Sequence, residues 1–139
     1  MIIDLLIILF VSIIAYTLDI SSAPKNYYKP CEKKIKIQLL QLGHHFLNIF
    51  GQFAWLSNDK TILYIYTFIP ILVILHWSTN KGNCVVSQIV NKGCNIDGYK
   101  FRELFNITEI DKYKYFSTIR YIYILFAWLI AIKKLRNIN

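Results

Sequence analysis

Four apolar stretches alternate with lysine-rich polar stretches along the 139-residue chain. The apolar stretches cover residues 2–20, 37–56, 61–77 and 115–132. An α-helix needs about 20 residues to cross the hydrocarbon layer of a bilayer, and these stretches approach that length. The pattern predicts an all-α integral membrane bundle of about four transmembrane helices in one domain, residues 1–139. Three helices are expected if the first is a signal peptide or the second lies in the membrane interface.

The first stretch has features of both a membrane anchor and a cleaved signal peptide. No basic residue precedes its apolar residues, and Pro24 directly follows the small-residue sequence that ends at Ala23. Both features disfavour cleavage, so we interpret Met1–Ile20 as an uncleaved anchor. Asp4, Ser12 and Asp19 share one face of this helix. We expect the two aspartates to mark the helix ends near water.

The second stretch carries polar residues on a single stripe. Their spacing of 3, 4, 3 and 4 residues places them on one helix face. They are Gln38, Gln41, His45, Asn48 and Gln52. Residues 61–77 are almost wholly apolar, so we expect the two stretches to form a hairpin with an inward polar seam. Gly43 and Gly51 would allow a neighbouring helix to approach closely. A helix lying in the interface is the alternative for residues 37–56.

A polar segment, residues 78–114, separates the last two stretches. Its glycines predict turns, and residues 99–114 mix apolar and charged side chains as a short amphipathic helix does. Asn106 begins the chain's one N-x-S/T sequon and is a possible glycosylation site. Arg120 lies inside the last stretch, where it should reach back to the surface or pair with a carboxylate such as Asp19.

The net charge of +8 resides largely in the polar loops. These lysines form no basic helix with interleaved aromatic residues, which disfavours nucleic acid as a partner. They indicate topology and contact with anionic headgroups of the lipid bilayer. With four spans, residues 24–36 and 78–114 share one side and carry 11 of the 16 basic residues. This bias predicts that both loops face the cytosol, with both termini on the other side.

Three cysteines, Cys31, Cys84 and Cys94, then lie in the reducing compartment. We expect free thiols, with one disulfide and one free thiol as the alternative. A lumenal loop would reverse this expectation. Asn106 would then be open to glycosylation, and Cys84–Cys94 would become a candidate disulfide.

The candidate chemistry is sparse. His45, His76 and Cys84 are the loose candidates for a metal site, but the hairpin geometry keeps His45 mid-span and His76 at a helix end. Hydrogen-bonded structural histidines are therefore expected, with no cofactor. No motif for a catalytic triad, a phosphate-binding loop or a zinc protease is present, and no catalytic residue is assigned.

The helix end "LHWSTNKGNC" carries His76, Trp77, Asn80 and Cys84. Together with "LGHHFLNIFG" and the abundance of residues with AT-rich codons, it resembles small multi-pass membrane proteins of unknown function encoded by large double-stranded DNA viruses. The resemblance covers residues 37–94 and implies a virion or host endomembrane setting, with no activity attached.

The sequence therefore favours a non-enzymatic, structural or scaffolding membrane protein, which associates with itself or with other membrane proteins through the polar seam. One alternative is a small membrane enzyme or redox or metal-binding protein that uses His45, His76 and Cys84. A further alternative is an oligomeric channel of the viroporin type, lined by the polar stripe.

Overall fold

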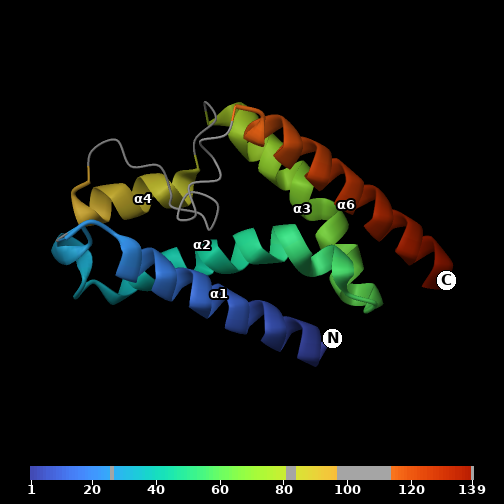
Figure 1. Cartoon of the computed structure of the whole chain (residues 1–139), viewed down its shortest axis with the longest axis horizontal. Helices are drawn as coiled ribbons and strands as arrows, with labels where there is room; N and C mark the ends of the chain where they lie inside the picture. Colours follow the sequence, from blue (N-terminus) through green and yellow to red (C-terminus); the bar gives the residue numbers. More distant parts are fainter. Residues whose placement is uncertain (26, 81–83, 97–113, 139) are drawn as a thin grey trace.

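The computed structural model describes residues 1–25, 27–80, 84–96 and 114–138, without the side chains of residues 77, 116, 117 and 120 (Figure 1). Every regular element in these ranges is helical, which confirms the all-α prediction there. The helices are α1 (Ile2–Ser22), α2 (Ile35–Phe53), α3 (Lys60–Thr79), α4 (Val85–Cys94) and α6 (Phe116–Ile138). Two short 3-10 turns, η1 (Lys29–Cys31) and η2 (Ala54–Leu56), lie before and after α2.

The described long helices pack in two antiparallel pairs. Helix α1 lies along α2, and α3 lies along α6 (Figure 1). The two pairs meet at the end that carries both termini and the α2–α3 turn, and they diverge towards the other end, where α4 lies against α2. The expected hairpin of residues 37–56 with 61–77 is therefore not the main pairing. Two residues of the polar stripe of α2, Gln41 and His45, find their hydrogen-bond partner on α1 instead.

An apolar core fills the region where the two pairs meet. It combines bulky side chains from α1, α2 and α3 with alanines from α1 and α6, which let the helices approach closely. Its fully buried members include Ile49, Ile62, Leu63, Tyr66, Ala127 and Ala131. The Tyr123 hydroxyl of α6 donates to the Gln52 carbonyl at 2.6 Å, which ties α6 to the end of α2.

Polar contacts hold the end at which the pairs meet. The Ser57 hydroxyl donates to the Asp4 carboxylate at 2.6 Å, and Lys134 Nζ donates to the carbonyls of η2 and Ser57 at 3.1–3.2 Å. Asp59 is the N-cap of α3 and accepts from two backbone N–H groups. The Met1 ammonium lies 3.0 Å from the same carboxylate. The α2–α3 turn is thus bound to both α1 and α6.

Part of the predicted polar loop, residues 78–114, is helical. Helix α4 occupies Val85–Cys94 and ends at Asn95 in the left-handed conformation, with φ of 56°. Its last residue, Cys94, forms a disulfide with Cys31. The prediction of three free thiols is therefore wrong, and one disulfide with free Cys84 is the observed state in the described residues. Cys84 and Cys94 lie about 15 Å apart along α4, which rules out their pairing here.

Two predicted features and one predicted contact cannot be compared with the structure. The amphipathic helix over residues 99–114 and the sequon at Asn106 fall outside the described residues. The pairing of Arg120 with Asp19 involves a side chain that is not described, so it stays a prediction.

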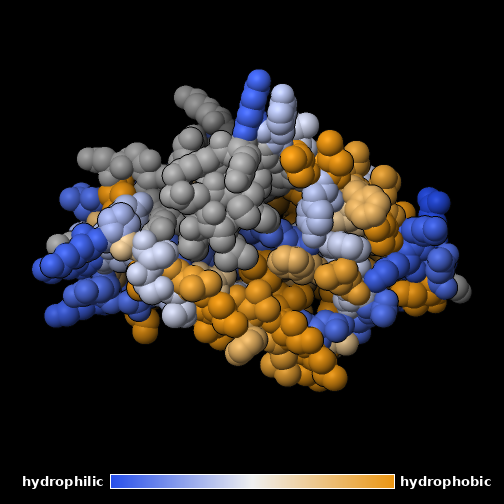
Figure 2. All heavy atoms as spheres, in the orientation of Figure 1, coloured by the Kyte–Doolittle hydropathy of each residue, from blue (hydrophilic) through white to orange (hydrophobic). Residues whose placement is uncertain are grey.

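The surface of the described residues is strongly apolar. Large apolar side chains on α1, α3 and α6 are exposed, among them Ile3 at 72% and Leu72 at 59%. Figure 2 shows a broad hydrophobic region on one face of the molecule, with hydrophilic side chains gathered at its two ends. Within the described part of the chain, α1 is the one helix long and apolar enough to cross a membrane by length and composition. Lys60–His76 forms a shorter apolar helix.

Candidate functional site

The inner face of α1 carries two polar residues that are completely buried. Its buried positions are Ile8, Ser12, Ala15 and Asp19, spaced 4, 3 and 4 residues apart. The Ser12 hydroxyl donates to the Ile8 carbonyl at 2.6 Å, which satisfies it within its own helix. Asp19 is 0% exposed. The expectation that Asp19 marks a helix end at water is wrong, because α2 and the α1–α2 loop cover it.

Three side chains bind the Asp19 carboxylate. Tyr28 in the α1–α2 loop places its hydroxyl 3.0 and 2.9 Å from the two oxygens. From α2, Gln41 Nε2 donates at 3.0 Å and His45 Nε2 lies 3.2 Å away. These four residues are called the Asp19 cluster below. A buried carboxylate without such partners would cost several kcal/mol, on the order of the desolvation penalty for one ion. The cluster therefore fixes the register of α1 on α2.

The polar stripe of α2 is divided among three sets of contacts. Gln41 and His45 belong to the Asp19 cluster. Gln52 donates to Asn48 on the same helix, and the Gln38 amide donates to the Glu32 carbonyl in the preceding loop. The structure thus places two of the five predicted seam residues against a neighbouring helix. The stripe alone did not identify Asp19 and Tyr28. A carboxylate inside an apolar helix beside a polar-striped one is the signal that could have pointed to Asp19.

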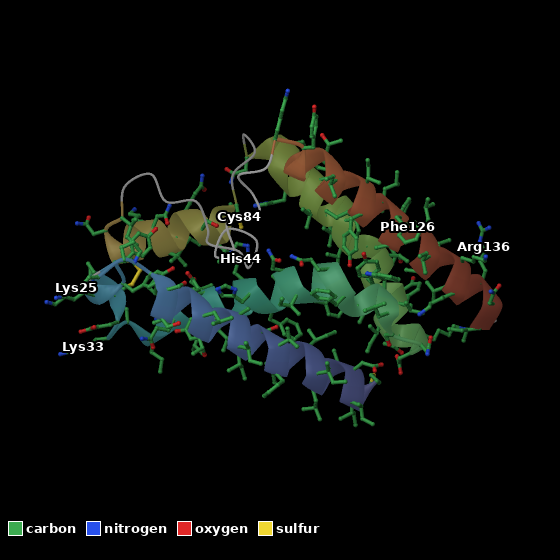
Figure 3. All side chains as sticks on the ribbon, in the orientation of Figure 1. Lys25, Lys33, His44, Cys84, Phe126 and Arg136 are labelled. Carbon is green, nitrogen blue, oxygen red and sulfur yellow. A yellow bond between two sulfur atoms is a disulfide. The ribbon has the colours of Figure 1, made fainter. Side chains whose placement is uncertain are left out.

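The candidate metal ligands are held in separate contacts. His45 is bound to Asp19, whereas His76 Nε2 accepts from the Val85 backbone N–H at 3.2 Å and so caps the start of α4. Cys84 Sγ lies 3.5 Å from His44 Nε2, a contact visible in Figure 3. Asn80 donates to Gln88 at 3.4 Å. No group of three or more potential metal-ligating side chains is found among the described residues.

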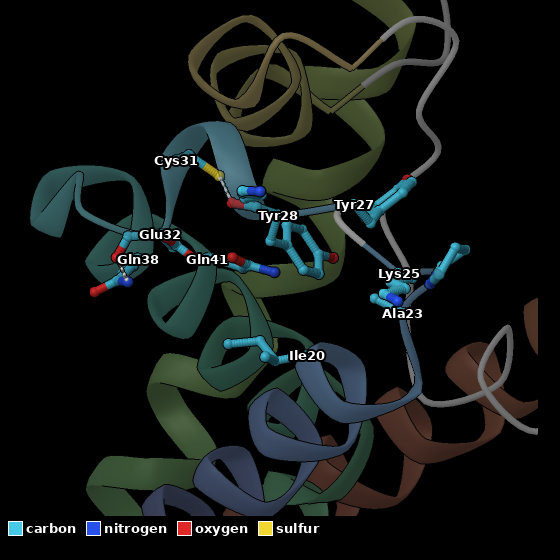
Figure 4. Close-up of a pocket in the computed structure, with 11 residues that line it drawn as sticks. Ile20, Ala23, Lys25, Tyr27, Tyr28, Cys31, Glu32, Gln38 and Gln41 are labelled. Atoms are coloured by element: carbon cyan, nitrogen blue, oxygen red, sulfur yellow. Dashed lines mark hydrogen bonds between the residues drawn. The ribbon is translucent and has the colours of Figure 1, made fainter.

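A cavity of about 460 Å³ opens beside the Asp19 cluster. It lies where α1 ends and α2 begins, and Tyr28 and Gln41 belong to both the cluster and the cavity lining (Figure 4). Its other lining residues include two apolar residues at the end of α1, two lysines of the α1–α2 loop and a glutamine of α2. These residues are Ile20, Ala23, Lys25, Lys29 and Gln38. The cavity can therefore offer cationic, amide and apolar contacts to one occupant.

A second depression of about 440 Å³ lies on α2 next to α4. Its lining is mainly apolar, with Leu39, Leu47 and Val86 among the residues, and His44 is its one ionisable member among the described residues.

Comparison of the chain with protein-family models, with curated protein sequences and with solved structures finds no match in any of the three.

Proposed function

We propose that this chain is a multi-pass membrane protein with a non-enzymatic, structural role. The observation that carries the proposal is the inverted distribution of side chains: apolar residues are exposed, whereas Asp19, Gln41, His45 and Ser12 are buried. In water, exposed apolar surface on this scale would be unfavourable by about 25 cal/mol for each Å². In lipid the same surface is well solvated, and the polar groups need partners inside the protein.

The dimensions of the helices support four crossings. Helices α1, α2, α3 and α6 have 21, 19, 20 and 23 residues. At 1.5 Å per residue they are about 28–35 Å long, close to the thickness of the hydrocarbon layer. Helix α2 carries the polar stripe, and its two most buried polar side chains, Gln41 and His45, are both satisfied by Asp19 on α1. Such pairing makes a span of this composition tolerable in lipid.

The structural role is supported by how the polar side chains are used. Each member of the Asp19 cluster bonds one element to another, and His76 caps a neighbouring helix. Lys134 and Ser57 likewise join different elements at the opposite end. These contacts make the polar residues components of helix packing. The seam predicted for association with other chains serves here to join α1 and α2, so a pore lined by Gln41 and His45 would require α1 to move away.

The disulfide bears on the orientation. Cys31 precedes α2 and Cys94 follows α3, so the loops that flank these helices share one compartment. Because stable disulfides form in oxidising compartments, we place these loops on the lumenal or external side and both termini in the cytosol. This orientation is opposite to the one that the lysine bias predicts. The sequon at Asn106 belongs to the same loop and would then be accessible to glycosylation.

The setting rests on the sequence resemblance alone. We propose a virion membrane or a host endomembrane during infection by a large double-stranded DNA virus, with the lipid bilayer and its headgroups as the main partner. Further copies of the chain or other membrane proteins would contact its outer apolar faces.

Site-specific photo-crosslinking in the full chain tests the membrane role. A photoreactive residue replaces Leu72 or Phe126, which are exposed on α3 and α6, or Leu63, which is fully buried. Membranes carrying the protein are washed at alkaline pH and then irradiated. We expect the protein to stay in the membrane and the two outer positions to form lipid adducts, with none at Leu63. Release by the alkaline wash would refute membrane insertion. Exclusive protein adducts at both outer positions would refute lipid-facing surfaces.

A further inference from the structure

We propose that the 460 Å³ cavity beside the Asp19 cluster binds the phosphate group of an anionic glycerophospholipid, whose acyl chains lie along the outer face of α1. The inference rests on the proposed membrane location and adds a defined lipid site to it. It is carried by the charge, the shape and the position of the cavity.

The charge of the lining suits an anion. Lys25 and Lys29 both line the cavity, against the one carboxylate of Glu32. Lysine ammonium groups bind phosphate as point charges. The buried Asp19 carboxylate lies behind the cavity wall, but it already accepts hydrogen bonds from Tyr28 and Gln41. These bonds offset part of its negative charge and so reduce its repulsion of an anionic occupant.

The position of the cavity matches the depth of a headgroup. Helix α1 ends at Ser22, and the cavity begins at Ile20 and Ala23, where the chain would leave the hydrocarbon layer. Ile20 is 41% exposed, and the same face of α1 continues with the exposed side chains of Ile13 and Leu9. A lipid whose phosphate lies in the cavity would find an apolar surface for its chains directly beside it. Free phosphate would use the cationic half of this site only.

The inner wall holds two amides in fixed orientations. Gln41 is 2% exposed, and its Nε2 is held by Asp19 at 3.0 Å, which fixes the direction of the amide. Gln38 is fixed in the same way by its bond to the Glu32 carbonyl. Figure 4 shows both amides close to the α1–α2 loop that carries the lysines. Each amide nitrogen has a second N–H group, and a donor in a fixed orientation binds an acceptor with a smaller entropic cost than a mobile one.

The test measures lipid retention by the full chain in detergent with native mass spectrometry, using phosphatidylglycerol as the probe and phosphatidylcholine as the reference. The double variant Lys25→Gln with Lys29→Gln removes the cavity lysines. Its matched control, Lys33→Gln with Lys36→Gln, removes the same charge from exposed positions that do not line the cavity, one in the same loop and one in the first turn of α2. We expect the first pair to weaken phosphatidylglycerol binding by about thirtyfold, through loss of two charged contacts to the phosphate, and the control pair by less than about threefold.

A second variant tests the cavity without changing its charge. Ala23→Phe should fill the space and reduce binding at least as much as the loss of both lysines, while the Cys31–Cys94 disulfide, checked on a non-reducing gel, reports an intact fold. Equal effects of the two lysine pairs, or full binding by Ala23→Phe with the disulfide formed, would overturn the proposal. Displacement of the lipid by millimolar glycerol phosphate would assign the site to free phosphate. Release of the chain from membranes at alkaline pH would instead overturn the proposed function.

Discussion

At the scale of single residues, the burial of Asp19 determines how α1 packs on α2. Its carboxylate accepts from Tyr28, Gln41 and His45, three side chains from two other segments. Sequence spacing identified the face of α1 that holds Asp19 and the stripe of α2 that holds Gln41 and His45. It could not show that the two faces meet, because an aspartate one turn from a helix end is equally compatible with exposure to water. The covering loop that contains Tyr28 decides the outcome.

Replacing Asp19 by alanine should lower the free energy of unfolding by about 3 kcal/mol, because it leaves buried donors without their acceptor. The change is followed by helical circular dichroism during denaturant titration in detergent micelles. Thr17→Ala, on the exposed face of the same helix, is the matched control and should change stability by less than about 0.5 kcal/mol. Equal stability of the two variants would show that the Asp19 cluster does not hold the helices.

Asp59 makes a pH-dependent contribution at the opposite end. The pKa of its carboxyl is lowered first by the hydrogen bond from the N-terminal ammonium and next by the Ile62 and Thr61 backbone N–H groups. Since the pKa is lower in the folded state, the stabilisation is present above the unfolded pKa and is lost as the pH falls through the folded value. Asp59→Asn should therefore be less stable than the parent at pH 7 and match it near pH 2. A constant difference across thermal melts at both pH values would contradict this assignment.

At the scale of elements, the sequence pattern did not predict helix α4. The apolar run of residues 85–90 is too short to distinguish a helix from a strand or a turn. Tertiary contacts hold the helix against the start of α2: the Cys31–Cys94 disulfide and the bond from Lys34 Nζ to the Gly93 carbonyl at 2.7 Å. The pairing of Cys31 with Cys94 spans 63 positions, so no local feature of the sequence indicates it.

Close packing against a glycine occurs at Gly93 in α4. The sequence pattern predicted it at Gly43 and Gly51 in α2. A Cβ at Gly93 would lie 2.5 Å from Ile37 Cδ1, whereas one at Gly43 meets nothing within 4 Å. Gly43→Ala should therefore stabilise α2 by about 0.5–1 kcal/mol through helix propensity. Gly93→Ala should gain nothing or lose up to about 1 kcal/mol, because Ile37 must leave its rotamer. Denaturant titration of both variants measures the difference, and equal gains would contradict the close contact.

The disulfide should account for much of the stability of this end. Closing a loop of this length removes chain entropy from the unfolded state worth about 4 kcal/mol. Cys94→Ser should lower the free energy of unfolding by about that amount and make α4 sensitive to limited proteolysis. Cys84→Ser serves as the control, since it leaves the disulfide in place. An unchanged proteolysis pattern in Cys94→Ser would show that packing alone retains α4.

At the scale of the whole molecule, the sequence predicted the helical class and the positions of the long helices, because apolar length and periodicity are local properties. The predicted stretches 2–20, 37–56, 61–77 and 115–132 overlap α1, α2, α3 and α6. The pairing of these helices was not predictable in the same way. It depends on which buried polar group finds a partner, and Asp19 directs α2 to α1 while α3 pairs with α6.

Two signals, the lysine bias and the disulfide, predict opposite orientations of the molecule in the membrane. The lysine bias acts statistically during insertion, whereas the disulfide requires an oxidising compartment. The two loops joined by Cys31 and Cys94 must share one side in either case. The described ends of the helices agree with this arrangement, because both termini lie with the α2–α3 turn (Figure 1).

The most direct test of the membrane account is the labelling of single cysteines by an impermeant thiol reagent in sealed membranes. The background is Cys84→Ser with the native disulfide intact. Cysteines at Lys33 and Lys92, exposed near the disulfide, are compared with cysteines at Asn58 and Asn137, exposed at the other end. We predict that, from the lumenal or external side, the first two are labelled and the last two react only after permeabilisation. Labelling of all four from one side would contradict the proposal that these helices cross a membrane.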